Sequence, residues 1–197
     1  THIKIRKIFT PEHGINNRYQ AGEKVPGSSD YNIPIISLYG NKSQPNVKDL
    51  KDLDAIIFDI QDIGSRYYTY VSTMTEVMNA CRKANIPFVV FDRPNPLGGE
   101  VSGPLLDVDF HSFVGMHPIP IRHGMTIGEL SYMINREGWL EGSSKVDLYI
   151  VKMHGWERKM FYNDTGLQFI PPSPNIPNLD AAIMYSGICL FEGTNIS

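Results

Sequence analysis

The stretch AIIFDIQDIGSRYYTYVSTMTEVMNACRKANIPFVVFD, residues 55–92, decides the fold class of this 197-residue chain. Apolar runs at residues 55–60 and 86–91 are typical of strands buried on both faces. Between these runs, apolar residues recur at helical spacing from Tyr67 to Cys81. A strand, a helix and a second strand in this order normally form a parallel, right-handed unit. We therefore expect an α/β fold, with a Rossmann-like, mostly parallel sheet flanked by helices.

Further elements are expected on both sides of this unit. Strand-like runs lie at residues 3–9, 33–39, 118–122 and 146–151, and a short helical or irregular connection at 47–53. The two prolines of 118–122 place that strand at a sheet edge. A capping box from Thr126 to Glu129 predicts a helix that ends near Glu137. Asn178 or Asp180 is expected to cap a last helix that runs through Leu190.

The composition excludes several classes of protein. A hydrophobic content of 42% and a mean hydropathy of −0.21 are typical of a globular protein. The net charge of −3, without a basic stripe, gives no electrostatic basis for binding nucleic acid. No apolar run is long enough to predict a membrane span.

The sequence also lacks the motifs of common cofactors. It contains neither G-x-G-x-x-G nor a P-loop, and its histidines lack zinc-ligand spacing. Cys81 and Cys189 lie in apolar helical patterns and are interpreted as small buried hydrophobes. We therefore expect no cofactor and no resident metal.

Glu12 and His13 follow the first expected strand, where a parallel sheet binds its ligands. Pro11 and Gly14 suffice to make the turn, so the carboxyl and imidazole groups are free for another role. A partly buried carboxyl there is a candidate general acid. The alternative is a turn carboxylate that accepts hydrogen bonds from nearby backbone.

The densest polar cluster is Asp59, Gln61, Asp62 and Arg66, after the central strand. At least one of these residues is expected to contact substrate. Part of the cluster has a structural interpretation, because Asp62 is placed to cap the following helix and an Asp–Arg pair is available.

Tyrosines of the same segment divide by helical phase. Tyr67 and Tyr70 fall on the apolar stripe and are expected to pack in the core. Tyr68 falls off that stripe and is expected to face the crevice, where an aromatic ring suits a sugar face.

The remaining candidates lie in loops. Asp92 and Arg93 either bind substrate or form an ion pair that holds their loop, and Glu129 is mostly explained by its capping box. Glu23 lies in a polar loop, where it is either a second carboxylate brought in by loop closure or a solvated side chain. The further substrate-binding candidates are Asn95, His123, Ser173, Asn175, Glu192 and Asn195.

Nine segments together resemble one known family in their order along the chain. They are residues 11–14 (PEHG), 21–23 (AGE), 37–40 (SLYG), 59–70, 92–96 (DRPNP), 112–115 (SFVG), 122–129, 172–177 and 192–195. This order is similar to that of the bacterial exo-β-N-acetylmuramidases, long known as a domain of unknown function. The resemblance covers essentially the whole chain.

This resemblance implies a Rossmann-like catalytic region at 1–125, with 126–197 supplying the remaining elements and the start of a smaller, lid-like domain of a longer protein. It implies release of N-acetylmuramic acid from the non-reducing end of peptidoglycan fragments, in the periplasm or outside the cell. Glu12 is then the preferred catalytic carboxyl and Glu23 the second. The substrate also carries a lactyl carboxylate, which Arg66 or Arg93 is suited to hold.

Two other functions remain open from the sequence. A non-catalytic protein that binds cell-wall glycans would use the same cleft. A metal-dependent hydrolase would use Asp59 and Asp62.

Overall fold

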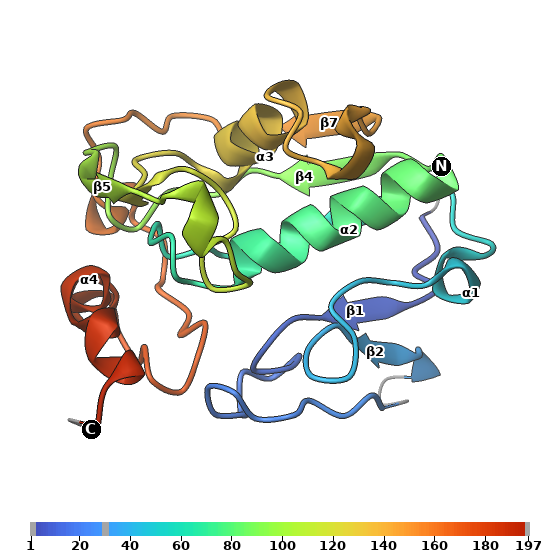
Figure 1. Ribbon diagram of the computed structural model, residues 1–197, viewed down its shortest axis with the longest axis horizontal. Helices are drawn as coiled ribbons and strands as arrows, with labels where there is room; N and C mark the ends of the chain where they lie inside the picture. The colour runs from blue at the N-terminus through green and yellow to red at the C-terminus, as the bar shows by residue number, and fades with distance from the viewer. Residues whose placement is uncertain (1–2, 29–31, 196–197) are drawn as a thin grey trace.

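The computed structural model describes residues 3–28 and 32–195 of the chain. Its strands are β1 (Ile8–Thr10), β2 (Ile35–Ser37), β3 (Ile56–Phe58), β4 (Phe88–Phe91), β5 (Ser102–Leu105), β6 (Pro120–Arg122) and β7 (Leu148–Val151). Its α-helices are α1 (Val47–Leu50), α2 (Tyr70–Ala84), α3 (Ile127–Arg136) and α4 (Leu179–Ile188). Short 3₁₀ helices lie at Val108–Phe110, Glu141–Ser143, Tyr162–Thr165 and Cys189–Gly193. The order of elements confirms the α/β class (Figure 1).

Most strand pairs are parallel. β3, β4 and β7 form one parallel sheet with β4 in the middle, and β1 pairs in parallel with β2. β5 and β6 form an antiparallel pair, which confirms 118–122 as part of a small edge structure. The unit β3–α2–β4 is the one that residues 55–92 predicted. β7 lies beyond residue 125, yet it pairs with β4 in the same sheet as the strands of the expected 1–125 region.

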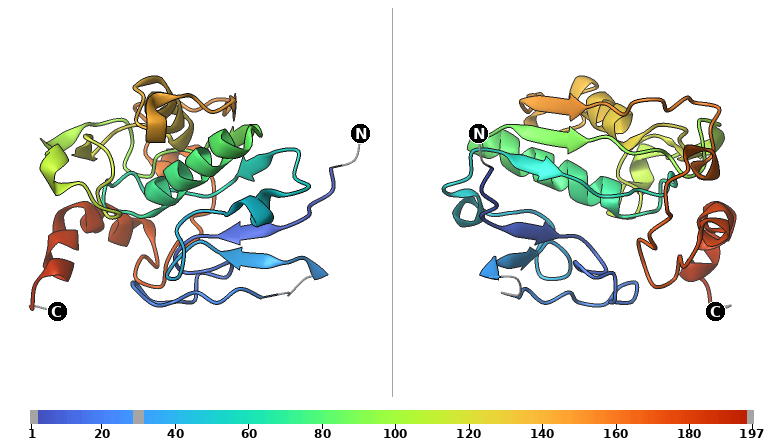
Figure 2. Two further views of the ribbon diagram at one scale, coloured as in Figure 1. Left: turned by 45° about the vertical axis from the view of Figure 1, so that its right-hand side comes forward. Right: turned by 180° about the vertical axis from the view of Figure 1, so that it is seen from behind.

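Helices α2 and α3 cover one face of the sheet formed by β3, β4 and β7 (Figure 2). α1, α2 and α3 contact one another in sequence order, and α3 also packs on β4 and β7. The core between them buries Phe88, Val90, Met78 and Leu130 almost completely. From behind, the strands lie in front of α2 (Figure 2), and Ile57, Phe91 and Tyr149 are exposed there.

β1 and β3 run in the same direction but are not hydrogen-bonded neighbours. A cavity of about 990 Å³ separates them. Its walls come from residues 3–11 on one side and 52–61 on the other. In the rear view of Figure 2, the arrows of β1 (dark blue), β3 (cyan), β4 (green) and β7 (orange) point the same way. The loops that follow these strands therefore share one edge of the molecule.

Several sequence expectations need correction at element ends. The first strand covers only Ile8–Thr10, and Ile3 and Ile5, which were expected to belong to it, are exposed. Residues 97–117 run over the surface and contain the exposed strand β5. Cys81 is buried, but Cys189 is only half-buried, in a 3₁₀ helix.

The start of α2 overturns the helical phase assigned to its tyrosines. The helix begins at Tyr70, with Thr69 as an N-cap residue whose side chain makes no cap hydrogen bond. Tyr67 is accordingly half-exposed beneath the Arg66 guanidinium, whereas Tyr68 is buried. Asp62 lies too far upstream to cap the helix and instead accepts a hydrogen bond from the Gly64 N–H.

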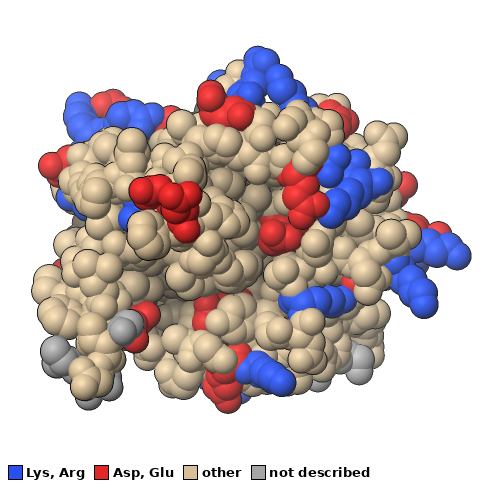
Figure 3. All heavy atoms as spheres, viewed as in Figure 1, with Lys and Arg blue, Asp and Glu red and all other residues tan. Residues whose placement is uncertain are grey.

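The surface is consistent with the composition. On the face of the molecule seen in Figure 3, which is that of Figure 1, Lys and Arg are interspersed with Asp and Glu rather than gathered in a basic stripe. Within residues 3–28 and 32–195, no helix has the length and apolar character that a bilayer crossing requires.

Candidate functional site

The turn after β1 places Glu12 and His13 at the shared edge. His13 has a positive φ of 72°, which a non-glycine residue adopts at a cost on the order of 1 kcal/mol. Its ring is fixed by an Nδ1–H bond of 2.7 Å to the Tyr19 carbonyl. The chain therefore bears local strain at the point where it turns Glu12 inward.

Glu12 is buried, and both of its carboxylate oxygens accept hydrogen bonds. Oε1 accepts a hydrogen bond of 2.8 Å from the Gly22 N–H, and Oε2 accepts one of 2.7 Å from the Thr69 hydroxyl. Glu12 is 6% exposed. Because burying an unpaired carboxylate is costly, these two donors fix both its position and its orientation.

Tyr39, which follows β2, lies beside this carboxylate. Burial, together with the hydrogen bond and negative charge of Glu12, raises the pKa of Tyr39 to about 12. The tyrosine thus keeps its proton and stands next to Glu12 as a neutral hydrogen-bonding group.

An aromatic cluster surrounds the same turn. Tyr68 stacks on His13 with ring centroids 6.4 Å apart, and meets Tyr70 edge to face at 4.6 Å. Tyr185 of α4 packs against Tyr68 from the other side. Tyr70 donates a 2.7 Å hydrogen bond to the Pro172 carbonyl, which ties the proline-rich segment to the site. Burial raises the pKa of Tyr68 and of Tyr70.

Asp62 and His123 form a second buried polar pair. His123 Nε2 lies 3.7 Å from Asp62 Oδ2, with side chains only 1% and 7% exposed. Among the described residues, Asp62 Oδ1, His123 Nε2 and the neighbouring Gln61 Oε1 have no hydrogen-bond partner. Gln61 donates through Nε2 to the Pro94 carbonyl and to the carbonyl of Asp62.

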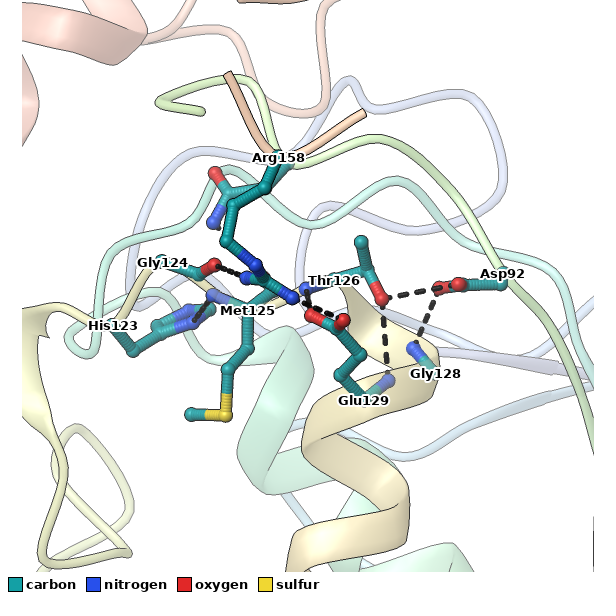
Figure 4. A network of polar contacts seen from close by, with 9 residues as sticks. Asp92, His123, Gly124, Met125, Thr126, Gly128, Glu129 and Arg158 are labelled. Atoms are coloured by element: carbon teal, nitrogen blue, oxygen red, sulfur yellow. Dashed lines mark hydrogen bonds and ion pairs between the residues drawn. The ribbon is translucent and has the colours of Figure 1, made fainter. Parts of the chain in front are cut away.

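Asp92 anchors the N-terminus of α3, as Figure 4 shows. Its carboxylate accepts hydrogen bonds of 2.8 Å from the Gly128 N–H and 3.0 Å from the Thr126 hydroxyl. Burial raises the pKa of Asp92, against these hydrogen bonds. A Cβ at residue 128 would lie 2.7 Å from Asp92 Cγ, so this close approach requires glycine.

Glu129 completes the capping box that the sequence predicted. It accepts from the Thr126 N–H and also pairs with Arg158, which donates to the Gly124 carbonyl (Figure 4). His123 lies just before this turn. These contacts give Glu129 and Asp92 an architectural role.

Of the two alternatives left open for Asp92 and Arg93, an ion pair between them is wrong. Arg93 instead donates through Nε and Nη2 to one oxygen of Asp59, at 2.9 and 2.6 Å. Asp92 is already occupied by α3, and the end of β3 lies beside that of β4. The Asp59–Arg93 pair is exposed and borders the large cavity.

Two other candidates have backbone partners. Arg66 donates to the carbonyls of Pro104 and Ile119, at 2.8 and 2.5 Å. Asn95 accepts from the Leu97 N–H and donates to the Met125 carbonyl. Both side chains thereby hold loops around the site.

The remaining candidates lie around the periphery. Ser173 is buried and accepts from the Asn175 N–H, while Asn175 itself is exposed. Glu23 is exposed and accepts from the Gln20 N–H within its own turn. Glu192 and Asn195 are exposed after α4.

The chain offers no evident metal centre in the part that the structure describes. There, no group of three or more His, Cys, Asp or Glu side chains is arranged to hold an ion. Asp59 and Asp62 are engaged by Arg93 and Gly64, respectively.

Sequence reasoning missed two residues that touch Glu12. Thr69 was not singled out, and Tyr39 belonged to a motif without an assigned role. The only signal for Thr69 was its position before a helix, which predicts a cap rather than a partner 57 residues away. Such long-range contacts follow from the fold alone.

Comparison with known proteins agrees with the fold and the motifs. The family model described as exo-beta-N-acetylmuramidase NamZ, N-terminal, matches residues 1–180. The chain is 46% identical over 198 residues to the peptidoglycan beta-N-acetylmuramidase NamZ of Bacillus subtilis (strain 168), covering 99% of this chain and 47% of that protein.

Two solved structures of DUF1343 family proteins from Bacteroides fragilis NCTC 9343 are also similar. One has a TM-score of 0.83 and 42% identity over 94% of this chain and 47% of its own. The other has a TM-score of 0.82 and 41% identity, over 96% and 49%. The chain thus spans about half the length of the relatives that it matches.

Proposed function

Because the chain belongs to the NamZ exo-β-N-acetylmuramidase family by its match to the N-terminal family model, we propose that its protein is an exo-acting glycoside hydrolase. The proposed reaction releases N-acetylmuramic acid from the non-reducing end of peptidoglycan fragments. The name of the Bacillus subtilis relative, which is 46% identical, supports this substrate class.

The observation that carries the proposal is the setting of Glu12. It is a buried carboxylate, at the edge where parallel strands bind ligands, and it is held by Thr69 and Gly22 beside the protonated Tyr39. We assign it as the catalytic carboxyl group that protonates the glycosidic oxygen or takes up a proton during hydrolysis. A second group activates water, attacks the sugar, or stabilises the oxocarbenium-like transition state.

Glu23 is our candidate for that second group. Its side chain is exposed, and it follows Gly22, whose N–H binds Glu12. A movement of this loop would therefore change the positions of Glu12 and Glu23 together.

We place the sugar in the large cavity between β1 and β3. At the carboxyl ends of the strands it is lined by Pro11, Gln61, Tyr70 and Pro172, which surround the Glu12 turn. Arg93 also lines it and is exposed, whereas Arg66 is buried against carbonyls. We therefore favour Arg93 for the lactyl carboxylate, by a charge-assisted contact.

Hydrolysis of a chromogenic N-acetylmuramide tests the function, using the natural full-length polypeptide. We expect turnover by the wild type and a loss of at least about 100-fold in kcat for Glu12→Gln. Glu141→Gln, at an exposed ion pair with Lys83, serves as a matched control. Circular dichroism verifies that each variant is folded.

Three results would each contradict part of the proposal. Full activity of Glu12→Gln would reject the catalytic carboxyl. Binding of N-acetylmuramic acid without any turnover would instead favour a glycan-binding protein. Retained preference for the muramide over the corresponding N-acetylglucosaminide in Arg93→Ala would reject the lactyl contact.

A further inference from the structure

We propose that Asp62 and His123 form a closed subsite for a single sugar hydroxyl, and that this subsite makes the enzyme exo-acting. The inference rests on the proposed function for its substrate. Neither side chain of this pair is among the contacts of Glu12 described above.

Asp62 has one satisfied and one free oxygen. Oδ2 accepts the Gly64 N–H at 2.7 Å, and Oδ1 has no partner among the described residues. The residue is 5% exposed, so solvent does not replace the missing donor freely. A buried acceptor without a partner is unfavourable for the folded state.

His123 presents the complementary group. Its Nδ1 accepts the Met125 N–H at 3.2 Å, which places the ring hydrogen on Nε2. In the part of the chain that the structure describes, that Nε2–H has no partner at hydrogen-bond distance, and Asp62 Oδ2 is 3.7 Å away. The two neighbouring side chains thus carry one free buried donor, His123 Nε2–H, and one free buried acceptor, Asp62 Oδ1.

The chemistry of the pair selects a hydroxyl group. A hydroxyl can donate to Asp62 Oδ1 and accept from the His123 Nε2–H through one oxygen atom. A carboxylate would be repelled by Asp62. A trans amide directs its N–H and its carbonyl to opposite sides, so it cannot satisfy two neighbouring groups.

The pair lies within reach of the proposed sugar site. Gln61, the neighbour of Asp62, lines the cavity, and so does Tyr70. The charges of both Glu12 and Asp62 act on the Tyr70 hydroxyl, so both carboxylates lie near this tyrosine. A sugar beside Glu12 can therefore direct a hydroxyl towards Asp62.

Because the pair is buried, it would limit which sugar residue of a glycan can bind. In a 1,4-linked glycan, the C4 hydroxyl is free only on the residue at the non-reducing end. A subsite that admits a hydroxyl but is closed behind it would exclude any residue whose C4 oxygen carries another sugar. Only the terminal N-acetylmuramic acid would then place its anomeric carbon beside Glu12.

Substrate analogues test this subsite in the natural full-length polypeptide. The chromogenic N-acetylmuramide is compared with its 4-deoxy and 4-O-methyl analogues. We expect kcat/KM of the wild type to fall about 100-fold or more for each analogue, as when a site built to bind a hydroxyl loses it.

Variants distinguish this subsite from a merely structural pair. Asp62→Asn and His123→Phe should lower kcat/KM of the parent substrate but leave that of the 4-deoxy analogue nearly unchanged, so that the preference shrinks. Asn79→Ala is the control, since Asn79 is buried and binds the Glu141 N–H. That variant should lower stability without altering the preference.

Equal losses on parent and 4-deoxy substrates in Asp62→Asn would overturn the proposal, and so would efficient hydrolysis of the 4-O-methyl analogue by the wild type. If the wild type does not hydrolyse the parent, the proposed function fails separately. The subsite is then tested by calorimetry with N-acetylmuramic acid and its 4-deoxy analogue. Equal affinities of the two sugars would reject it.

Discussion

The hydroxyl of Thr69 donates a 2.7 Å hydrogen bond to Oε2 of Glu12, across 57 residues of sequence. This bond joins the start of α2, which follows β3, to the turn after β1. The strands β1 and β3 belong to different sheets. Thr69 makes no side-chain cap hydrogen bond to its own helix, and its hydroxyl is directed to a buried carboxylate instead.

Thr69→Val should therefore affect catalysis more than binding. The substitution keeps the shape of the side chain but removes the donor, so we expect kcat to fall about 10-fold with little change in KM. Thr69→Ser restores a donor and should recover most of the activity. An unchanged kcat in the valine variant would show that Glu12 does not depend on this bond.

Replacing Gly64 tests the contact between the two loops after β3 and β4. Gly64 has φ +85°, and an added Cβ would lie 2.0 Å from Asn95 Oδ1. Asn95 cannot retreat easily, because both ends of its amide are hydrogen-bonded. We expect Gly64→Ala to lower the free energy of unfolding by about 3 kcal/mol, from overpacking and backbone strain.

Gly138→Ala is the matched control for that measurement. Gly138 also has a positive φ, of +73°, but no atom of the described residues lies within 4 Å of the added Cβ. Urea unfolding should show a loss of about 1 kcal/mol there, from the backbone conformation alone. Equal losses at the two glycines would mean that the Asn95 contact yields freely.

Asp92→Ala should destabilise the protein through the N-terminus of α3. The change removes the acceptor of the Thr126 hydroxyl and of the Gly128 N–H, which then lie unpaired in a partly buried position. We expect a loss of about 2 kcal/mol in the free energy of unfolding.

The comparison for Asp92 is Asp59→Ala, which breaks the exposed pair with Arg93. Because exposed ion pairs contribute little, thermal unfolding should show a loss below about 1 kcal/mol. A larger effect at Asp59 than at Asp92 would contradict the architectural role given to Asp92.

His117 should make stability depend on pH. Burial lowers the pKa of His117 to about 4, and its ring stacks on Trp139 while Nε2 bonds with the Thr75 hydroxyl. The unfolded chain binds a proton near pH 6.5, before the folded protein does. Stability is therefore fully present above pH 6.5 and is lost as the pH falls towards 4, by about 3 kcal/mol.

Urea unfolding between pH 7 and 4 measures this loss. His117→Gln keeps a donor for Thr75 but cannot titrate, so its stability should vary less over the same interval. If the free energy of unfolding of His117→Gln changes with pH as much as that of the wild type, other groups cause the pH dependence.

Local sequence patterns were enough to predict the fold class and the edge of the sheet where the candidate site lies. Two apolar runs on either side of a helical pattern sufficed for β3, α2 and β4, because buried parallel strands and a crossover helix leave strong local signals. The capping box of Thr126 and Glu129, and Asn178 as one of two expected caps of α4, could be predicted for the same reason: caps join residues only three apart.

Tertiary structure alone decided the partners of the polar side chains. Arg93 meets Asp59 rather than Asp92, Thr69 meets Glu12 rather than its helix, and Asp62 lies beside His123. These contacts join residues that are far apart in sequence, and each depends on how adjacent strands and loops are brought together. Local patterns report which groups stand at an edge, but only packing decides which donors reach which acceptors.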